Sequence, residues 1–514
     1  MTGCRFFSEK MLTFVAIKLS QKMKRIFITT CCLLAVVTLV AAATPRKKTT
    51  VTQNKPYQIL VISDIHLLAP QLYDKGEAAQ RLAQNDLKLV LQSDEIMQAT
   101  VDWAIKQKPS LVLITGDLTF NGEQASHHRL ATHLARLAQG GVPTLVIPGN
   151  HDVSNPNSRQ YIGSKATPAP TITRDEFAQV YSPYGYGNSS RRDPASLSYA
   201  CEPIPGLVVL GIDSNRDEEN RLVARGDTVN KYHSGGRVKP ETLQWLQQQA
   251  QQATAQGKHV IAMMHHHLIE HIDGEAKYLK DYIVDDHDQV AQTLASCGIH
   301  AVFTGHLHIT DAVTSGTLTE VATGSLSTYP MPMRVVTIDR ALDSLCVDTQ
   351  FASFGPSEQL LQQGREQIER NVPSEAKVLA RKIWPRLQDK YNQLMSFLHA
   401  NGTDVSHVPS GPDEAATLLV NNMRQPLTQI MLTITKGGED PQQAKALIAI
   451  VREGMVSMAC DAFPAQLADD MAHMLVENLM PRIEPTMRSA LEDRNQVGKP
   501  NESSTPDHRL TIQL

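Results

Sequence analysis

The sequence predicts an α/β protein, and three observations lead to that class. From Tyr57 to Phe351, short apolar runs alternate with stretches of helical spacing. The runs are rich in Val, Ile and Leu and hardly alternate with polar residues, which is typical of strands buried on both faces. Polar side chains follow directly after several runs, where open α/β sheets place their functional sites. Strands and helices in this order form α/β architecture.

The apolar runs give the predicted strands, which are Gln58–Ile62, Leu111–Thr115, Thr144–Ile147, Leu207–Ile212, His259–Met264, Ala301–Thr304, Leu318–Ala322, Arg334–Ile338 and Leu345–Thr349. The helices predicted between them are Asp94–Gln107, Ser126–Gln139 and Pro240–Gln256. The last of these begins with a proline, which the first turn tolerates, and is followed by Gly257, a common helix stop. These elements define a predicted domain over residues 54–352.

Residues 153–200 interrupt this pattern with a segment rich in Pro, Ser, Asn, Arg and Tyr. A long irregular segment directly after a motif is often a wall or lid of the site. A surface insertion that contacts nothing is the alternative, and the sequence leaves both open.

After Gly355 the strand-like runs end, and Ala, Gln, Met, Leu and Glu recur at helical spacing. We therefore predict a helical domain over 356–494, with a Met-rich stripe as its core, and a loose polar tail over 495–514. The predicted helices are Ser357–Arg370, Glu375–Leu398, Asp413–Thr435, Gln442–Cys460 and Gln466–Asn478. Their predicted breaks are at Pro441, Pro464, Pro481 and Pro485.

Composition is that of a soluble protein of more than one domain: 514 residues, 41% hydrophobic and 20% charged. The net charge of −4 offers no basic surface for nucleic acid, so we expect no duplex partner. A small anionic substrate remains possible, because bound metal ions would supply local positive charge.

The N-terminal residues 1–43 are typical of an extension followed by a signal peptide. Lys24-Arg25 precede the apolar run 26–40, and Ala41-Ala42-Ala43 offer a small-residue cleavage site. Export to the periplasm or the extracellular space is the expectation. The basic residues 46–48 would suit an uncleaved membrane anchor, which is the alternative. Met23 is a better natural start than Met1 for such a signal.

Four cysteines follow the expected cleavage site, namely Cys201, Cys297, Cys346 and Cys460. Their wide separation excludes paired zinc-type spacing. An exported protein could form disulfides among them, and buried free thiols are an equally open alternative.

Seven metal-binding side chains follow the ends of the predicted strands; they are Asp64, His66, Asp117, Asn150, His265, His306 and His308. Each motif alone is weak evidence, because a turn or a structural histidine would also explain it. Their joint occurrence fits a two-metal site that hydrolyses phosphate esters. Asp64 and His66 alternate with Ile65, so both side chains point the same way.

The motifs suggest different roles. The carboxylate of Asp117 can bridge two ions, and Asn150 can offer an amide oxygen to the second. His151 would lie beside the ions without binding them. In the run His265-His266-His267, alternation places the outer two on one face, although a solvated metal-scavenging tract is also possible.

Five other histidines are expected at the surface. A solvated helix face is the expectation for His127, His128 and His133, and His271 and His287 are expected to be surface residues.

Together these motifs resemble the calcineurin-like metallophosphoesterase family over residues 57–351. Within that family, Gly116 to Thr119 and Met264-His265-His266 are similar to the cyclic-nucleotide and glycerophosphodiester phosphodiesterases. The resemblance implies a four-layer α/β sandwich of two mixed sheets flanked by helices, to which the C-terminal all-helical appendage is added. It also implies a dinuclear metal centre.

Carried over by motif, the ligands divide into two sets that share Asp117. The first ion would be held by Asp64, His66, Asp117 and His308, and the second by Asp117, Asn150, His265 and His306. The family usually has proline where this chain has His267, so His266 also remains a candidate ligand. The position directly after Met264 favours His265.

This ligand set suits two divalent ions among Mn, Fe, Zn and Co better than Ca. A water activated between them would attack phosphorus in line. His151 would stabilise the phosphoryl oxygens or protonate the departing oxygen.

The expected function is that of an exported phosphoesterase, with phosphodiesters favoured as substrates. A phosphomonoesterase or nucleotidase using the same site is one alternative, and a metal-retaining scaffold without turnover is another. The substrate would be a small-molecule or lipid-head-group phosphoester, and the oligomeric state is open.

Overall fold

The computed structural model describes residues 55–222, 231–351, 358–438, 440–492 and 508–514. The predicted signal segment 1–43 lies outside the described residues. Residues 56–514 form one compact unit. The structure therefore does not divide this region at the predicted boundary between the 54–352 and 356–494 domains, and that boundary stays a prediction. Among the described residues, no helix combines the length and the apolar character needed to cross a bilayer.

The first sheet is mixed and has the strand order β15-β14-β13-β1-β2-β3. Strands β1, β2 and β3 run parallel, and β13, β14 and β15 continue the sheet antiparallel. The bounds are Tyr57–Ile62 (β1), Leu111–Ile114 (β2), Thr144–Val146 (β3), Pro332–Ile338 (β13), Ser344–Phe351 (β14) and Arg509–Gln513 (β15).

The second sheet is also mixed, with the order β11-β12-β10-β9-β8-β7-β6. Its centre, β8, β9, β10 and β12, is parallel, whereas its two edges are antiparallel. The bounds are Arg191–Arg192 (β6), Tyr199–Ile204 (β7), Leu207–Ile212 (β8), His259–Met264 (β9), Ile299–Thr304 (β10), Asp311–Ser315 (β11) and Leu318–Ala322 (β12).

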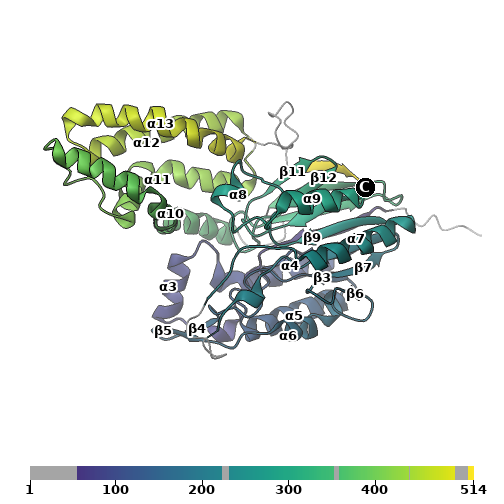
Figure 1. Cartoon of the computed structure of the whole chain (residues 1–514). Coiled ribbons are helices and arrows are strands. Elements are labelled where there is room, and N and C mark those ends of the chain that lie inside the picture. Colours follow the sequence, from purple (N-terminus) through teal and green to yellow (C-terminus); the bar gives the residue numbers. More distant parts are fainter. Residues whose placement is uncertain (1–54, 223–230, 352–357, 439, 493–507) are drawn as a thin grey trace, which may run out of the picture. The chain divides into compact units, whose positions relative to one another are not determined.

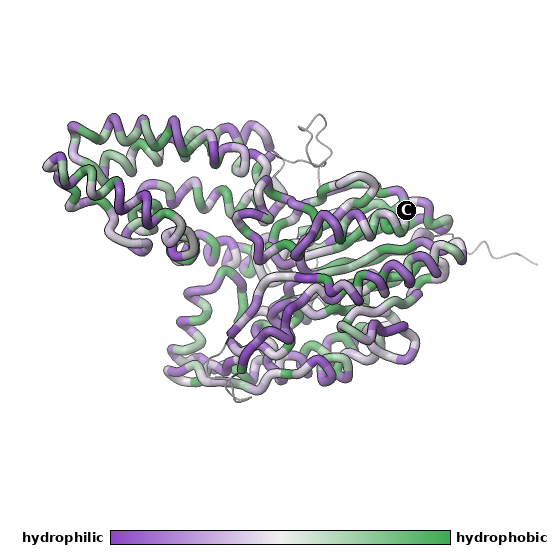
Figure 2. Tube along the Cα trace, viewed as in Figure 1, coloured by the Kyte–Doolittle hydropathy of each residue, from purple (hydrophilic) through white to green (hydrophobic). Residues whose placement is uncertain are grey.

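Helices cover the outer face of each sheet and complete four layers (Figure 1). The helices α4 (Ser93–Gln107) and α5 (Gln124–Gln139) share one hydrophobic core with the first sheet, and α7 (Pro240–Ala255) and α9 (His287–Ser296) share another with the second. Figure 2 shows hydrophobic stretches along the strands between these helices.

Successive side chains of β8 and β9 point to opposite faces of the second sheet, so each strand contributes to both hydrophobic cores. In β9, Ile261 and Met263 belong to the core that includes the first sheet, and Val260, Ala262 and Met264 belong to the core under α7 and α9. Both faces of the strand are therefore buried, as its uninterrupted apolar sequence predicts. The predicted α/β sandwich is confirmed.

The segment 153–200 contributes several buried side chains to the core of the first sheet, although the strand Lys165–Pro168 within it is exposed. Tyr181 is fully buried and Tyr186 nearly so, both in the core of the first sheet. The expectation of a surface insertion without contacts is wrong, because these rings supply core volume. Its elements are β4 (Arg159–Ile162), β5 (Lys165–Pro168), α6 (Arg174–Val180) and the short 3-10 helix Ser182–Tyr184.

Short elements connect the layers. They are the 3-10 helices Pro70–Leu72, Val90–Gln92 and Asp217–Glu219, and the helices α3 (Glu77–Asn85) and α8 (Glu275–Tyr278).

The C-terminal region is helical, as predicted: α10 (Glu358–Ala400), α11 (Pro412–Lys436), α12 (Pro441–Ala462) and α13 (Ala465–Leu491). The Met-rich stripe is core, with Met423, Met455 and Met480 buried together. Two details differ from the prediction. The two helices expected over 357–398 are one helix, α10, over the described residues of that range, and Pro481 and Pro485 lie inside α13 rather than ending it. A proline removes one backbone hydrogen bond, which these long helices accommodate.

The expectation of a loose tail is wrong for its last residues. Residues 509–513 form β15 and pair antiparallel with β14. Ile512 is only 5% exposed and belongs to the core of the first sheet. Its burial explains why the chain end joins the sheet. The four cysteines of the described region are free thiols.

Candidate metal centre

The predicted ligands lie where the carboxyl ends of strands from both sheets meet. Asp64 and His66 follow β1, Asp117 follows β2 and Asn150 follows β3, all in the first sheet. His265 follows β9, and His306 and His308 follow β10, in the second sheet. The structure brings all seven together, although their metal binding remains a prediction.

Five of these seven residues have left-handed backbone conformations: Asp64 (φ 51°), His66 (46°), Asp117 (46°), His306 (72°) and His308 (61°). Such conformations are uncommon outside glycine and cost on the order of 1 kcal/mol or more each. Hydrogen bonds between the strand-end motifs hold these residues in the left-handed conformation. His66 N donates to Asp117 O at 2.9 Å, and His306 N donates to Asp64 Oδ2 at 3.0 Å.

The first donor cluster is formed by Asp64, His66, Asp117 and His308. His308 Nε2 lies 3.1 Å from His66 Nε2 and 3.3 Å from Asp64 Oδ1, and His66 Nε2 lies 3.6 Å from Asp117 Oδ2. Donors around an ion with bonds of about 2.0–2.2 Å are roughly 2.8–3.6 Å apart. Asp64 Oδ1 is buried and has no hydrogen-bond partner within the described part of the chain. These residues fit a divalent ion.

The second cluster shares Asp117 and adds Asn150, His265 and His306. His265 Nε2 lies 3.0 Å from Asn150 Oδ1 and 3.3 Å from Asp117 Oδ1, and His306 belongs to the same donor group. The other ring nitrogens donate to carbonyls: His265 Nδ1 to Thr115 O at 2.8 Å and His306 Nε2 to Asp281 O at 2.9 Å. Such bonds orient histidine ligands toward an ion.

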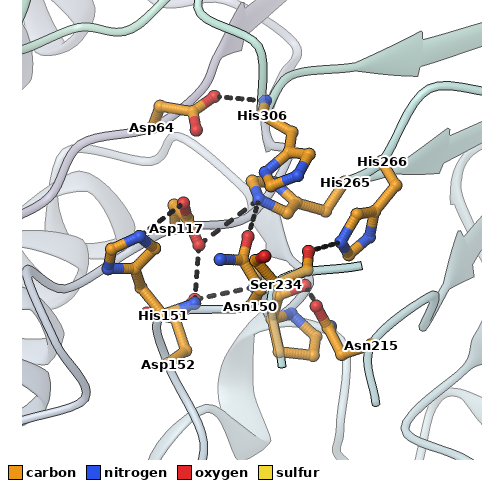
Figure 3. A network of polar contacts seen from close by, with 12 residues as sticks. Asp64, Asp117, Asn150, His151, Asp152, Asn215, Ser234, His265, His266 and His306 are labelled. Carbon is orange, nitrogen blue, oxygen red and sulfur yellow. Dashed lines mark hydrogen bonds and ion pairs between the residues drawn. The ribbon is translucent and has the colours of Figure 1, made fainter. Parts of the chain in front are cut away.

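In the run His265-His266-His267, the structure favours His265 over His266 as the candidate metal ligand. Figure 3 shows the ring of His265 beside Asp117 and Asn150. The ring of His266 instead contacts Ser214 Oγ at 2.8 Å and donates to Ser234 O at 2.9 Å. Both ring nitrogens of His266 are thus occupied, so geometry leaves His265 as the candidate ligand.

The electrostatics of the centre favour a bound cation. Burial opposes the charge of Asp117, but the imidazoles of His265 and His151 hold the pKa of this carboxyl well below its ordinary value. Burial lowers the pKa of His66 and His306 far below the ordinary histidine value. These two imidazoles are therefore neutral and present lone pairs, as metal ligands must.

His151 lies beside the two clusters and faces the cavity. Its Nδ1 donates to Phe120 O at 2.6 Å, and its Nε2 lies 3.9 Å from Asp117 Oδ2. The side chain is 22% exposed and lines the cavity. This position fits the predicted role next to a substrate, and it also places His151 in one donor group with His66 and Asp117.

Asp152 holds two of the motif loops together. Its carboxylate accepts hydrogen bonds from Leu118 N, Thr119 N, Thr119 Oγ1 and Gly149 N, at 2.8–3.0 Å. The loops must also approach closely, because a Cβ at Gly149 would collide with Asp117. The carboxylate and the glycine together fix the position of Asp117.

Two neighbours of the centre were not predicted. The hydroxyl of Tyr232 accepts a hydrogen bond from Asn150 Nδ2, and its ring lies 5.9 Å from that of His151. Lys88 Nζ lies 3.2 Å from Asp86 Oδ1 at the edge of the cavity. Neither residue follows a strand end, so no local sequence signal marks them.

A cavity of about 430 Å³ opens over the donor clusters. Besides the centre itself, its walls include residues of α10 and α11, namely Ile368, Glu375, Met431, Ile434 and Thr435. The described segment 153–200 contributes no lining residue, so the expectation that it forms a wall of the site is also wrong. The helical appendage forms that wall instead.

Three other histidines are buried, contrary to expectation. His127 and His133 are fully covered, because α5 packs its histidine face against neighbouring elements; His133 Nε2 lies 2.7 Å from Asp94 Oδ1 of α4. His271, also expected at the surface, is buried next to Asp311 and Glu320.

The chain is similar in structure to a dimetal phosphatase from Danio rerio (14% identity, TM-score 0.39, 58% of this chain and 96% of that chain). It is also similar to a purple acid phosphatase from yellow lupin seeds (11%, 0.37, 59% and 53%) and to a phosphopantetheinyl hydrolase from Mycobacterium tuberculosis (13%, 0.27, 53% and 91%). Curated protein sequences gave no match.

The family model of the calcineurin-like phosphoesterases matches residues 57–310. That segment contains the seven predicted ligands and His151. Residues 57–310 of this chain are therefore similar to the calcineurin-like phosphoesterase family, whose model they match.

Proposed function

We propose that the protein is an exported, dinuclear-metal phosphoesterase that prefers phosphodiesters. The observation that carries the proposal is the position of Asp117, whose Oδ2 lies 3.6 Å from His66 Nε2 and whose Oδ1 lies 3.3 Å from His265 Nε2. One carboxylate thus reaches both donor clusters. Two ions held in this way would polarise the phosphoryl group and lower the pKa of water. The mixed N and O donors suit Mn, Fe, Zn or Co.

The chain's own residues account for the remaining steps. His151 has Nδ1 tied to a backbone carbonyl, so its Nε2 is directed to the cavity. From there it can bind a phosphoryl oxygen or pass a proton to the departing oxygen. Tyr232, whose pKa burial and Asp117 raise well above the ordinary value, stays protonated, and its hydroxyl holds the side-chain amide of Asn150.

Two features support a diester preference over a monoester. The motif resemblance is to the cyclic-nucleotide and glycerophosphodiester phosphodiesterases. In addition, α10 and α11 add Ile368, Met431 and Ile434 to the cavity wall. This apolar surface could hold the second ester group, for which a phosphomonoester has no counterpart.

The proposed export rests on the N-terminal signal in the sequence. It makes extracellular or periplasmic esters, such as glycerophosphodiesters, phospholipid head groups or nucleotides, the proposed substrates. Expression of the full chain followed by fractionation and N-terminal sequencing tests this. Recovery of uncleaved chain in the cytoplasm would contradict the proposal.

The catalytic proposal is tested with Asp117→Asn. In the presence of Mn²⁺, hydrolysis of bis(p-nitrophenyl) phosphate should fall about 100- to 1000-fold, since the transition state loses its electrostatic support. Asp102→Asn, at an exposed carboxylate of α4, is the matched control and should keep full activity.

The rates at which the wild-type protein hydrolyses bis(p-nitrophenyl) phosphate and the monoester p-nitrophenyl phosphate distinguish the alternative functions. A preference for this monoester would favour a phosphomonoesterase. Bound metal without turnover of any ester would favour the scaffold function instead.

A further inference from the structure

A second buried cluster of histidines and carboxylates lies behind the catalytic centre. It is formed by His267 after β9, His271 in the next loop and Glu320 in β12, and all three are buried. The Nε2 atoms of His267 and His271 have no hydrogen-bond partner among the residues that the structure describes. Buried polar atoms without partners are uncommon in proteins, and two that face one another are compatible with a bound ion.

Carboxylates behind the two histidines fix how the rings face. His267 Nδ1 lies 2.7 Å from Glu275 Oε1, and His271 Nδ1 lies 2.7 Å from Asp311 Oδ2. Each Nδ1 therefore carries the hydrogen, and each Nε2 presents its lone pair to the middle of the cluster. Carboxylate–histidine pairs of this kind are the usual support of metal-binding histidines.

Glu320 is fixed just as firmly. Its Oε2 accepts hydrogen bonds from Leu268 N at 2.9 Å and Ile269 N at 2.6 Å. Its Oε1 accepts one from Thr304 Oγ1 at 2.6 Å and lies 3.4 Å from His271 Nε2. One carboxylate oxygen therefore faces the two imidazole nitrogens.

We propose that His267, His271 and Glu320 bind a single divalent ion of the zinc class, at a site separate from the catalytic pair. Their donor atoms lie within 4.8 Å of one another. Two imidazole nitrogens and one carboxylate oxygen form a ligand set that zinc uses in proteins, with a fourth position for water. The site thus needs only a small closing movement to reach bonding distances.

Charge supports a cation over an empty cluster. Three carboxylates, those of Glu275, Asp311 and Glu320, face the two imidazoles of the cluster, so a bound cation would balance negative charge there.

The location indicates a structural role. The loop that carries His271 continues to Asp273, whose backbone N donates to Ser489 Oγ of α13 at 2.7 Å. Thr486 Oγ1 of the same helix donates to Asp273 O at 3.1 Å. An ion here would fix the loop between the end of β9, which carries His265, and the helical appendage.

Metal content tests the proposal independently of activity. The full chain, expressed with zinc and dialysed, should contain three equivalents by mass spectrometry, and His271→Gln and His267→Gln should each contain two. The matched control is His133→Gln, a buried histidine that also pairs with a carboxylate; it should retain three.

Asp117→Asn distinguishes this site from the catalytic pair. This variant should lose zinc from the pair yet keep one equivalent, and adding His271→Gln should remove it. Cobalt substitution of Asp117→Asn gives a second readout, since its visible absorption should disappear in the double variant while circular dichroism shows that the double variant is folded. A wild type with two equivalents, or a third equivalent that His271→Gln retains, would overturn the proposal.

Discussion

The side-chain amide of Asn150 donates a hydrogen bond to the hydroxyl of Tyr232, 82 positions further along the chain. The bond occupies Nδ2 and turns Oδ1 toward His265, whose Nε2 lies 3.0 Å away. The amide oxygen is therefore presented to the second donor cluster in a fixed direction. Tyr232 acts on the centre through Asn150, which makes it a positioning residue.

Tyr232→Phe should weaken the second metal site while the fold is retained. Loss of a residue that orients a ligand typically reduces metal affinity 10- to 100-fold, and we expect about 10-fold here. Titration with Mn²⁺, followed by calorimetry, would show two equivalents with one of them weakened. Tyr278→Phe, at a tyrosine 56% exposed, is the control. Equal affinities in both variants would show that Asn150 needs no such support.

Met431 of α11 lines the cavity and should help to select the substrate. Met431→Ala removes apolar contact surface worth about 1–1.5 kcal/mol. KM for a diester with a bulky apolar second group should therefore rise about 5- to 10-fold, with kcat nearly unchanged. A small diester should be unaffected.

Met474→Ala serves as the control for that change, because Met474 is 40% exposed on α13. If Met431→Ala alters small and bulky diesters equally, the appendage does not form a subsite.

The fold and the donor set were predictable because both depend on local patterns. Uninterrupted apolar runs predict buried strands, and a ligand directly after a strand is carried to the sheet edge wherever the strand pairs. Asp64 and Asp117 therefore meet without any knowledge of the partner strand.

The burial of His133 and His271 depends on distant segments. Helical spacing places His133 on one face of α5, but only the packing of α4 reveals that this face meets Asp94. His271 is enclosed by β11 and β12, which follow it by some 40 residues or more. Single-sequence periodicity contains no information on which element covers a face.

Asp94 should make the stability depend on pH. Its carboxylate accepts hydrogen bonds from Arg129 Nε at 2.6 Å and Arg129 Nη2 at 2.8 Å, and it pairs with His133. Burial alone would raise the pKa of Asp94, but these partners lower it to about 2. Because the folded pKa lies below the unfolded value of about 3.9, the stabilisation is complete above that value and disappears as the pH falls toward 2.

Asp94→Asn should therefore lower the free energy of unfolding by about 1–2 kcal/mol at pH 7, allowing for partial solvent screening. The difference from wild type should shrink at pH 3. Urea unfolding at both pH values measures it, with Asp102→Asn as an exposed control. A difference that does not depend on pH would assign the effect to packing rather than charge.

Ile512 tests whether the chain end belongs to the fold. The tail reads as polar and loose in the sequence, because a single strand of five residues has little local signal. In the structure Ile512 pairs with Leu345 of β14, and both side chains are buried in the core of the first sheet. β15 covers the edge of that sheet and satisfies backbone groups of β14 that would otherwise be unpaired.

Ile512→Ala should lower the free energy of unfolding by about 2–3 kcal/mol, the lower part of the range for truncating a buried isoleucine, because the site is at a sheet edge. Thr511→Ala changes the adjacent, exposed side chain of the same strand and should cost less than about 0.5 kcal/mol. The urea midpoints of unfolding of the two variants give the comparison.

The outcome bears on the metal centre, because β14 is hydrogen-bonded to β13, and β13 to β1. A loss of stability confined to Ile512→Ala would show that the last strand stabilises the sheet that carries Asp64 and Asp117. Equal midpoints would show that the tail contributes nothing to it.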